Sequence, residues 1–200
     1  QYGNLTRKTH TNTSWDKARF ESCGQKWADL SEGHYGVSLL NDCKYGHSVK
    51  DSCVSLTLIK SGIEPNPTTD QETHHFTYAI YPHAETWRAA GTVREAYFLN
   101  QPALAVAGGV PGDSFSLAFC DAPNVVVETV KQADDGDGVI VRMYESENAL
   151  TETVLHWGLP FASAESCDCL EQPDGEPVAV EDGSVRFTIK PYEIKTLRIR

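Results

Sequence analysis

The sequence predicts an all-β protein built from antiparallel strands, and two kinds of observation lead to this prediction. Apolar residues recur at every second position in several short segments, which is typical of strands with one buried face. Sequences rich in Gly and Asp separate these segments, as expected for tight turns between neighbouring strands. The segments with the clearest alternation are residues 54–58, 76–81, 139–144 and 184–189.

Turn signals are densest in the second half of the chain. Asp134–Gly138 lies between two apolar runs and predicts a hairpin connection. Gly-containing turns at residues 174–175 and 182–183 bracket a short strand predicted at Val178–Val180. Near the C-terminus the apolar phase changes, and a β-bulge at residues 195–196 would keep the apolar side chains on both sides of it facing inward.

One segment has a helical pattern instead. Trp87, Ala90 and Val93 recur at three-residue steps, so residues 84–99 are predicted to form an amphipathic helix. Gly91 lies in the middle of this segment and would cost a helix about 1 kcal/mol relative to alanine.

A change in composition predicts two domains. Residues 101–113 are rich in Pro, Gly and Ala and carry no charge before Asp113. The short, regularly spaced strands after this segment are typical of a small sandwich. We therefore expect a first domain over residues 1–104, a linker over 105–113 and a β-sandwich over 114–200.

The negative charge of the chain argues against nucleic acids and anionic lipids as partners. The formal net charge is −11, whereas nucleic-acid phosphates and anionic lipids attract cationic surfaces. No apolar run is long enough to span a bilayer, so no membrane association is expected. The start at Gln1 has neither an initiator Met nor a signal-peptide pattern, and we expect the chain to be a piece of a longer one.

The cysteines are expected to be reduced. Cys167 and Cys169 are one residue apart, where a mutual disulfide would be strained, and no CxxC pair occurs. Free thiols are typical of a reducing compartment, and we therefore expect a cytoplasmic protein.

The residues do not predict a complete hydrolytic site, which needs a nucleophile or metal together with an acid or base. The chain contains no GxSxG, HExxH, Walker or GxGxxG motif. His74 and His75 would point to opposite faces of a strand. His75 and His83 would lie about 26 Å apart if the chain between them were extended. No metal site is expected within these residues.

Polar loops are the remaining candidates for ligand contact. Asn41–His47 offers amide, carboxylate, ammonium and phenol groups, which suit the hydroxyls and the apolar face of a sugar. The same composition fits a solvated hairpin whose Asn and Asp side chains bond to the local backbone. Trp15, in the polar stretch Thr9–Asp16, would stack on a sugar or anchor a core.

Several stretches together resemble one enzyme family. They are Thr9–Glu21, Trp27–Glu32, Tyr35–Gly46, Phe76–His83 and Glu128–Ala133. In order and spacing they resemble the C-terminal region of glycoside hydrolase family 38 α-mannosidases, in the cytosolic and bacterial branch. The string LLNDCKYG within the third stretch is the most specific of these matches.

The resemblance implies a fold and a set of partners. The parent enzyme would be a retaining exo-α-mannosidase acting on terminal α-mannosides, with its catalytic zinc and nucleophilic aspartate in an N-terminal domain followed by a helical domain. The present chain would end a large, galactose-mutarotase-like β supersandwich and add a small terminal β-sandwich. It would pack on the catalytic and helical domains, bind no cofactor itself and be inactive alone. A homo-oligomer is a further alternative, for which the residues give no direct sign.

The resemblance places two loops at the border of the substrate cleft. The expected cleft-lining residues are Asn41, Asp42, Lys44, Tyr45, Asp70 and His74. Family members usually show Asp-x-Gly-x-His-x-Phe in the second loop, where this chain has Glu72 in place of Gly. If that position needs a positive φ, Glu72 changes the loop. A free-standing carbohydrate-binding β-sandwich remains as an alternative function.

Overall fold

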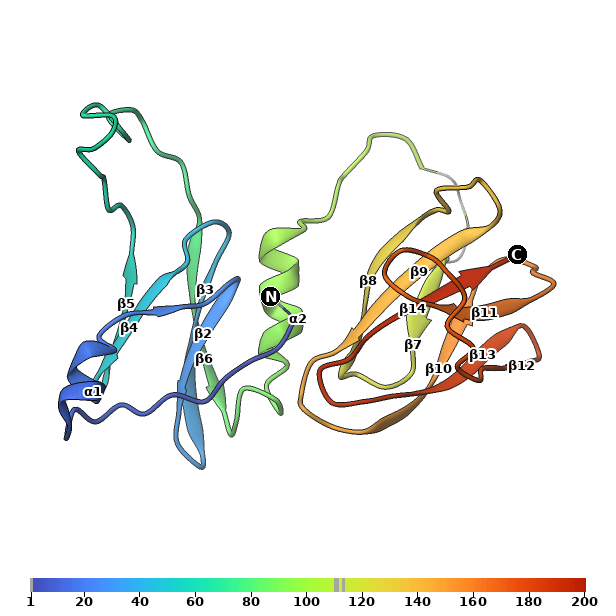
Figure 1. Cartoon of the computed structure of the whole chain (residues 1–200), viewed down its shortest axis with the longest axis horizontal. Coiled ribbons are helices and arrows are strands. Elements are labelled where there is room, and N and C mark those ends of the chain that lie inside the picture. Colours follow the sequence, from blue (N-terminus) through green and yellow to red (C-terminus); the bar gives the residue numbers. More distant parts are fainter. Residues whose placement is uncertain (1, 110–111, 113) are drawn as a thin grey trace. The chain divides into compact units, whose positions relative to one another are not determined.

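The chain forms two compact units of antiparallel sheet (Figure 1). The computed structural model describes residues 2–109, 112 and 114–200. Residues 6–107 form the first unit, and residues 108–200 together with the N-terminal segment up to Leu5 form the second unit. The predicted all-β class is confirmed, while the domain boundaries drawn from composition stay a prediction. No helix among the described residues is long and apolar enough to cross a membrane.

The first unit contains two three-stranded sheets. One has the order β2-β3-β6 and the other β1-β4-β5. The strands of the first sheet are β2 (Trp27–Ser31), β3 (Tyr35–Asn41) and β6 (Tyr78–Ala84). Those of the second are β1 (Ser22–Cys23), β4 (Gly46–Lys50) and β5 (Cys53–Thr57). A short helix, α1 (Ser14–Ala18), precedes them, and Thr13 and Asp16 form its capping box.

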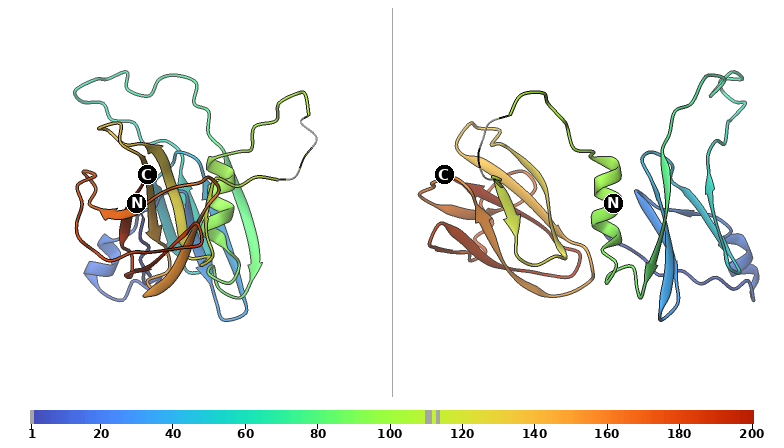
Figure 2. Two further views of the ribbon diagram at one scale, coloured as in Figure 1. Left: turned by 90° about the vertical axis from the view of Figure 1, so that its right-hand side faces the viewer. Right: turned by 180° about the vertical axis from the view of Figure 1, so that it is seen from behind.

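The helix of this unit is shorter than predicted. Helix α2 (Thr92–Asn100) begins after Gly91, whose φ of +66° places it in the left-handed region at the N-cap. The predicted span of residues 84–99 is therefore wrong at its start, because the periodic pattern ran across a strand end and a turn. Helix α2 contacts β2 and β3 (Figure 2), with Thr92 and Ala96 buried.

Strand β6 presents the face opposite to the one predicted. The alternation placed Tyr78 and Ile80 inward, but they are 55% and 67% exposed, and His83 on the other face is buried. Tyr81 lies on the buried face too, and its hydroxyl donates to the carbonyl of Ala90 at 3.0 Å. Both faces of β6 carry bulky side chains, so alternation alone could not identify the inner one.

The second unit is a sandwich of two four-stranded sheets. Their orders are β12-β13-β10-β7 and β11-β14-β9-β8. The strands of the first sheet are β7 (Ala118–Cys120), β10 (Thr151–Trp157), β12 (Ala179–Glu181) and β13 (Ser184–Ile189). Those of the second are β8 (Val125–Gln132), β9 (Val139–Glu145), β11 (Ala164–Cys167) and β14 (Ile194–Ile199).

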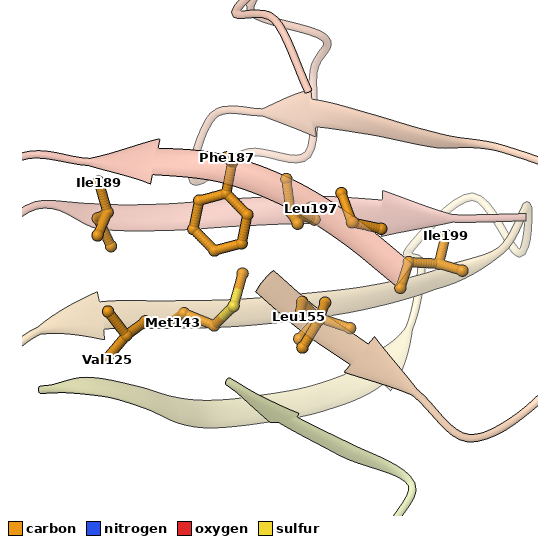
Figure 3. Close-up of a cluster of buried hydrophobic side chains, with 9 residues drawn as sticks. Val125, Met143, Leu155, Phe187, Ile189, Leu197 and Ile199 are labelled. Carbon is orange, nitrogen blue, oxygen red and sulfur yellow. The ribbon is translucent and has the colours of Figure 1, made fainter. Parts of the chain in front are cut away.

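Apolar side chains from the two sheets meet in one core (Figure 3). Met143 and Leu197 come from one sheet, Leu155 and Phe187 from the other, and all four are buried. Burying a side chain of this size contributes about 1.5–3 kcal/mol. This core is what the alternation in residues 184–189 predicted.

The turns of this sandwich agree with the sequence, whereas the bulge does not. Residues 182–183 form a two-residue hairpin loop in which both φ angles are positive, at 46° and 75°. Strand β14 pairs with β9 without a break from Ile194 to Ile199, so the bulge predicted at residues 195–196 is wrong. Ile194 is instead 39% exposed and lies on the face opposite to Leu197 and Ile199, because unbroken pairing keeps the alternation of side chains.

Candidate functional site

Asn41 is the last residue of β3, and its buried side chain supports the first candidate loop, residues 41–47. Its side chain is buried, and its Oδ1 accepts a hydrogen bond from the backbone N–H of Lys44 at 2.7 Å. Its Nδ2 lies 3.4 Å from Nε2 of His47, and its carbonyl accepts from Nδ2 of Asn100 at 3.0 Å. Burial lowers the pKa of His47. The hydrogen bond from the Lys44 backbone to Asn41 is of the kind expected for a solvated hairpin, in which Asn side chains bond to the local backbone. Asn41 therefore positions the loop.

Asp42 ties this loop to the start of β6. The backbone N–H of Thr77 donates to Oδ2 of Asp42 at 2.9 Å, and the backbone N–H of Asp42 donates to the carbonyl of Thr77 at 3.2 Å. The Thr77 N–H and the thiol of Cys43 hold the pKa of Asp42 below its ordinary value. The carboxylate is thus charged at neutral pH and lies at the surface.

Aromatic rings extend the same surface. The ammonium of Lys44 lies 4.9 Å from the centroid of the Phe76 ring, within the range of a cation–π contact. The Phe76 and Tyr78 rings are stacked with centroids 6.4 Å apart. Tyr45 and Tyr78 are each 55% exposed. Residues 42–45 and 76–78, which we call the Lys44 surface, therefore combine charge with exposed rings.

Asp70 and His74 bond to each other. Nε2 of His74 lies 2.9 Å from the carbonyl oxygen of Asp70, which only accepts, so this nitrogen carries the hydrogen. Asp70 has a φ of 60°, and Glu72 is not among the residues with positive φ. Glu72 therefore adds no left-handed strain where the family pattern has Gly. The chain leads from His74 directly into Phe76 of the Lys44 surface.

Sequence reasoning did not identify three members of this surface. Phe76, Thr77 and Tyr78 were assigned to a strand, although the first two precede β6. The Phe76 ring and the Thr77 backbone both contact the loop. The usable signal was their place in one of the family-like stretches, right after the second candidate loop. The pairing of Asp42 with Thr77 spans 35 residues and has no local sequence signal.

A separate hollow of about 490 Å³ is lined by residues of both sheets of the first unit. Its lining is mainly apolar and includes Val37, Leu39, Val54 and Ile80, with no residue of the Lys44 surface. Polar side chains complete the lining, at residues 31–32 and 51–52.

The described residues do not fit a zinc centre. Within residues 2–109, 112 and 114–200, no group of three His, Cys, Asp or Glu side chains is placed to hold a metal ion. One pair of possible ligands is buried: Nε2 of His83 lies 2.7 Å from Oδ2 of Asp29. The same carboxylate oxygen accepts from Ser38 at 2.8 Å, and Ser38 bonds to Thr92, so this pair belongs to the packing of α2 on its sheet.

Two family models match the chain in succession. The model described as "Glycosyl hydrolases family 38 C-terminal domain" matches residues 1–68. The model described as "Glycosyl hydrolases family 38 C-terminal beta sandwich domain" matches residues 124–197, within the second unit.

Curated relatives match over nearly the whole chain. Human alpha-mannosidase 2C1 is 41% identical over 203 residues, which cover 98% of this chain and 20% of the human protein. Alpha-mannosidase G of Dictyostelium discoideum is 38% identical, with 99% of this chain and 19% of that protein covered. The alpha-mannosidase of Saccharomyces cerevisiae is 33% identical, with 100% and 20% covered. The chain thus spans about a fifth of the length of these relatives.

Solved structures show the same fold. An alpha-mannosidase from Enterococcus faecalis V583 superposes with a TM-score of 0.76 and 19% identity, over 100% of this chain and 23% of that one. A second family 38 protein from Enterococcus faecalis gives a TM-score of 0.73 at 17% identity, over 100% and 24% of the two chains. At these identities the comparison establishes the fold.

Proposed function

The chain belongs to glycoside hydrolase family 38, and from this premise we propose that it is the C-terminal, non-catalytic part of a retaining, zinc-dependent exo-α-mannosidase. The resemblance carried by its motifs is confirmed at the level of the family. The observation that supports the proposal most is the succession of two C-terminal family models along a chain whose described residues gather no metal-ligand set. Zinc and the nucleophile would then be supplied by a catalytic domain of the parent enzyme.

In this proposal the chain packs on the catalytic and helical domains and borders the cleft for a terminal α-mannoside. The Lys44 surface supports such a role, because Asp42 accepts hydrogen bonds, Lys44 donates them and Tyr45 offers a ring to the apolar face of a pyranose. Asn41 would act as a positioning residue for this loop, since its side chain is buried. Asp70 and His74 would line the same border from the adjoining loop.

The remaining expectations belong to the same proposal. A place in mannose metabolism follows from the activity of the parent enzyme. A cytoplasmic location is supported by the state of the cysteines, all six of which lie in described segments and are free thiols. A homo-oligomer stays compatible with the exposed apolar side chains of the first unit.

A second candidate function is a free-standing carbohydrate-binding module. The observation that favours it is the exposure of Tyr45 and Tyr78 beside charged groups, which is an arrangement suited to a sugar ring. The two functions differ in whether this chain alone completes a binding site.

A sugar titration of the isolated chain tests the two functions. Methyl α-mannoside is added to high millimolar concentration while backbone amide signals are followed by NMR. The proposed function predicts no saturable shift, because the loop borders a cleft that other domains complete. Saturating shifts at residues 42–45 and 76–78 that disappear in Lys44→Ala, and persist in the exposed control Lys50→Ala, would instead support the module.

A further inference from the structure

The N-terminal segment binds to the far end of the chain through one asparagine side chain. Nδ2 of Asn4 donates to the carbonyl of Ser146 at 2.7 Å, and the hydroxyl of Tyr192 donates to Oδ1 of Asn4 at 2.7 Å. Both the nitrogen and the oxygen of the side-chain amide are therefore hydrogen-bonded, to groups that lie 142 and 188 residues away in the sequence. The Ser146 carbonyl accepts and the Tyr192 hydroxyl donates, so together they suit an amide, which has one donor and one acceptor group. A carboxylate at position 4 would place a second acceptor against the carbonyl and be repelled by it.

Two further contacts accompany this amide. The Tyr2 ring lies 4.8 Å from the Tyr144 ring between centroids, tilted by 42°. The backbone at Gly3 passes over the Tyr192 ring, where an added Cβ would lie 3.7 Å from the ring carbons. Aromatic contacts of this kind contribute beyond the area they bury. The segment up to Leu5 accordingly belongs to the second unit, although the next residues belong to the first.

The receiving surface is built around a buried carboxylate. Glu145 is fully buried, and its oxygens accept from the backbone N–H of Tyr192 at 3.0 Å, of Glu147 at 2.7 Å, and from Nδ2 of Asn124 at 2.9 Å. These bonds hold Tyr192 in its left-handed conformation, with φ at 56°, and so direct its hydroxyl. Ser146 is fixed in turn, because its N–H and hydroxyl both donate to the carbonyl of Asn124.

From these contacts we propose that residues 2–5 are a clasp, and that Ser146, Tyr192 and Tyr144 form its docking surface on the sandwich. The polypeptide leaves the second unit after Leu5 and returns to it at Gly108. The segment up to Leu5 and the sandwich therefore form one unit, although residues 6–107 of the other unit lie between them in the sequence. A truncated protein that starts at residue 114 would contain the sandwich but lack the segment that contacts Tyr192.

The clasp is tested by backbone relaxation and amide exchange in the full chain, comparing Asn4→Ala with Asn12→Ala. Asn12 is an exposed asparagine of the first unit and serves as the matched control. In the wild type the amides of Gly3 and Asn4 should be as rigid as those of the sandwich. Asn4→Ala should make these amides flexible and speed exchange at Tyr192 and Glu193 roughly tenfold, since two hydrogen bonds are lost. Asn12→Ala should change neither.

Two further variants separate the docking contacts from general destabilisation. Tyr192→Phe removes only the hydroxyl and should release the segment while the exchange of β9 and β14 core amides stays unchanged. Asn4→Asp should release it more completely than Asn4→Ala, because a carboxylate oxygen then faces the Ser146 carbonyl. If residues 2–5 are flexible in the wild type, or if all variants behave like Asn12→Ala, the clasp does not exist.

Discussion

Glu145 shows how one residue organises three segments of the sandwich. Burial raises the pKa of this carboxyl, but hydrogen bonds from the Tyr192 backbone, from Asn124 and from the Glu147 backbone outweigh burial, and the pKa lies below its ordinary value. The charged form is thus favoured in the folded state. Its stabilising contribution is complete above the unfolded pKa of about 4.3 and is lost as the pH falls through the lower folded pKa.

Glu145→Gln is therefore expected to weaken the sandwich in a pH-dependent way. The amide places a donor among groups that all donate, so we expect the free energy of unfolding to fall by about 1–3 kcal/mol at pH 7. Urea unfolding of wild type and variant at pH 7 and pH 3 provides the measurement. The difference should shrink at pH 3, because the carboxyl of the unfolded wild type is then protonated and part of the stabilisation by the charge is lost. An equal difference at both values would contradict the proposed role of the charge.

Residue chemistry identified part of the candidate site before the structure. Asp42, Lys44 and Tyr45 are distinguishable in the sequence by composition, and the structure places all three in the loop that follows β3. The buried state of Asn41 and the pairing of Asp42 with Thr77 were not predictable, because they depend on contacts with residues 47, 77 and 100. Whether the loop borders a substrate stays a prediction.

At the scale of elements, turn residues carried more information than helical periodicity. Gly91 was interpreted as a defect inside a helix, whereas its positive φ begins the helix. Strand β9 was expected to bury one face, yet both faces are largely buried because β8 and β14 flank it within a sandwich. Neighbours in a sheet are set by distant parts of the chain, and alternation within one strand does not report them.

Gly91→Ala should destabilise the first unit. A side chain in the left-handed conformation costs about 1–2 kcal/mol, and the added Cβ would meet only the flexible end of Arg94 at 3.6 Å, so the effect is one of backbone strain. The measurement is thermal unfolding followed by the NMR amide signals of residues in the first unit. Gly33→Ala is the control, because its Cβ would meet nothing within 4 Å and its φ is not positive. Equal stabilities of the two variants would contradict this account of α2.

At the scale of the whole molecule, both units expose large apolar side chains, and five in the first unit illustrate this. Tyr35, Ile59, Ile63, Tyr78 and Ile80 are each at least half exposed, with Ile63 at 74%. Tyr35 and Ile80 line the same hollow, and exposed apolar side chains that gather in one place favour contact with another protein surface. In the proposed function this partner is another domain of the parent enzyme, a proposal that fits the length of the relatives, of which the chain covers about a fifth.

The isolated chain should consequently self-associate. We expect sedimentation velocity to show species larger than a monomer that grow with protein concentration, since apolar surface is removed from water on association. Ile80→Thr, at a 67% exposed position on β6, should reduce this tendency. A monomer at all concentrations would show that the exposed surface is no interface.

We propose that this chain contributes to an α-mannosidase whose catalytic centre lies in other domains. The most direct measurement is the hydrolysis of an aryl α-mannoside by the purified chain with added zinc, together with the zinc content of the protein after dialysis. We expect turnover at background and no stoichiometric zinc. Turnover above background, with one zinc retained per chain, would contradict it.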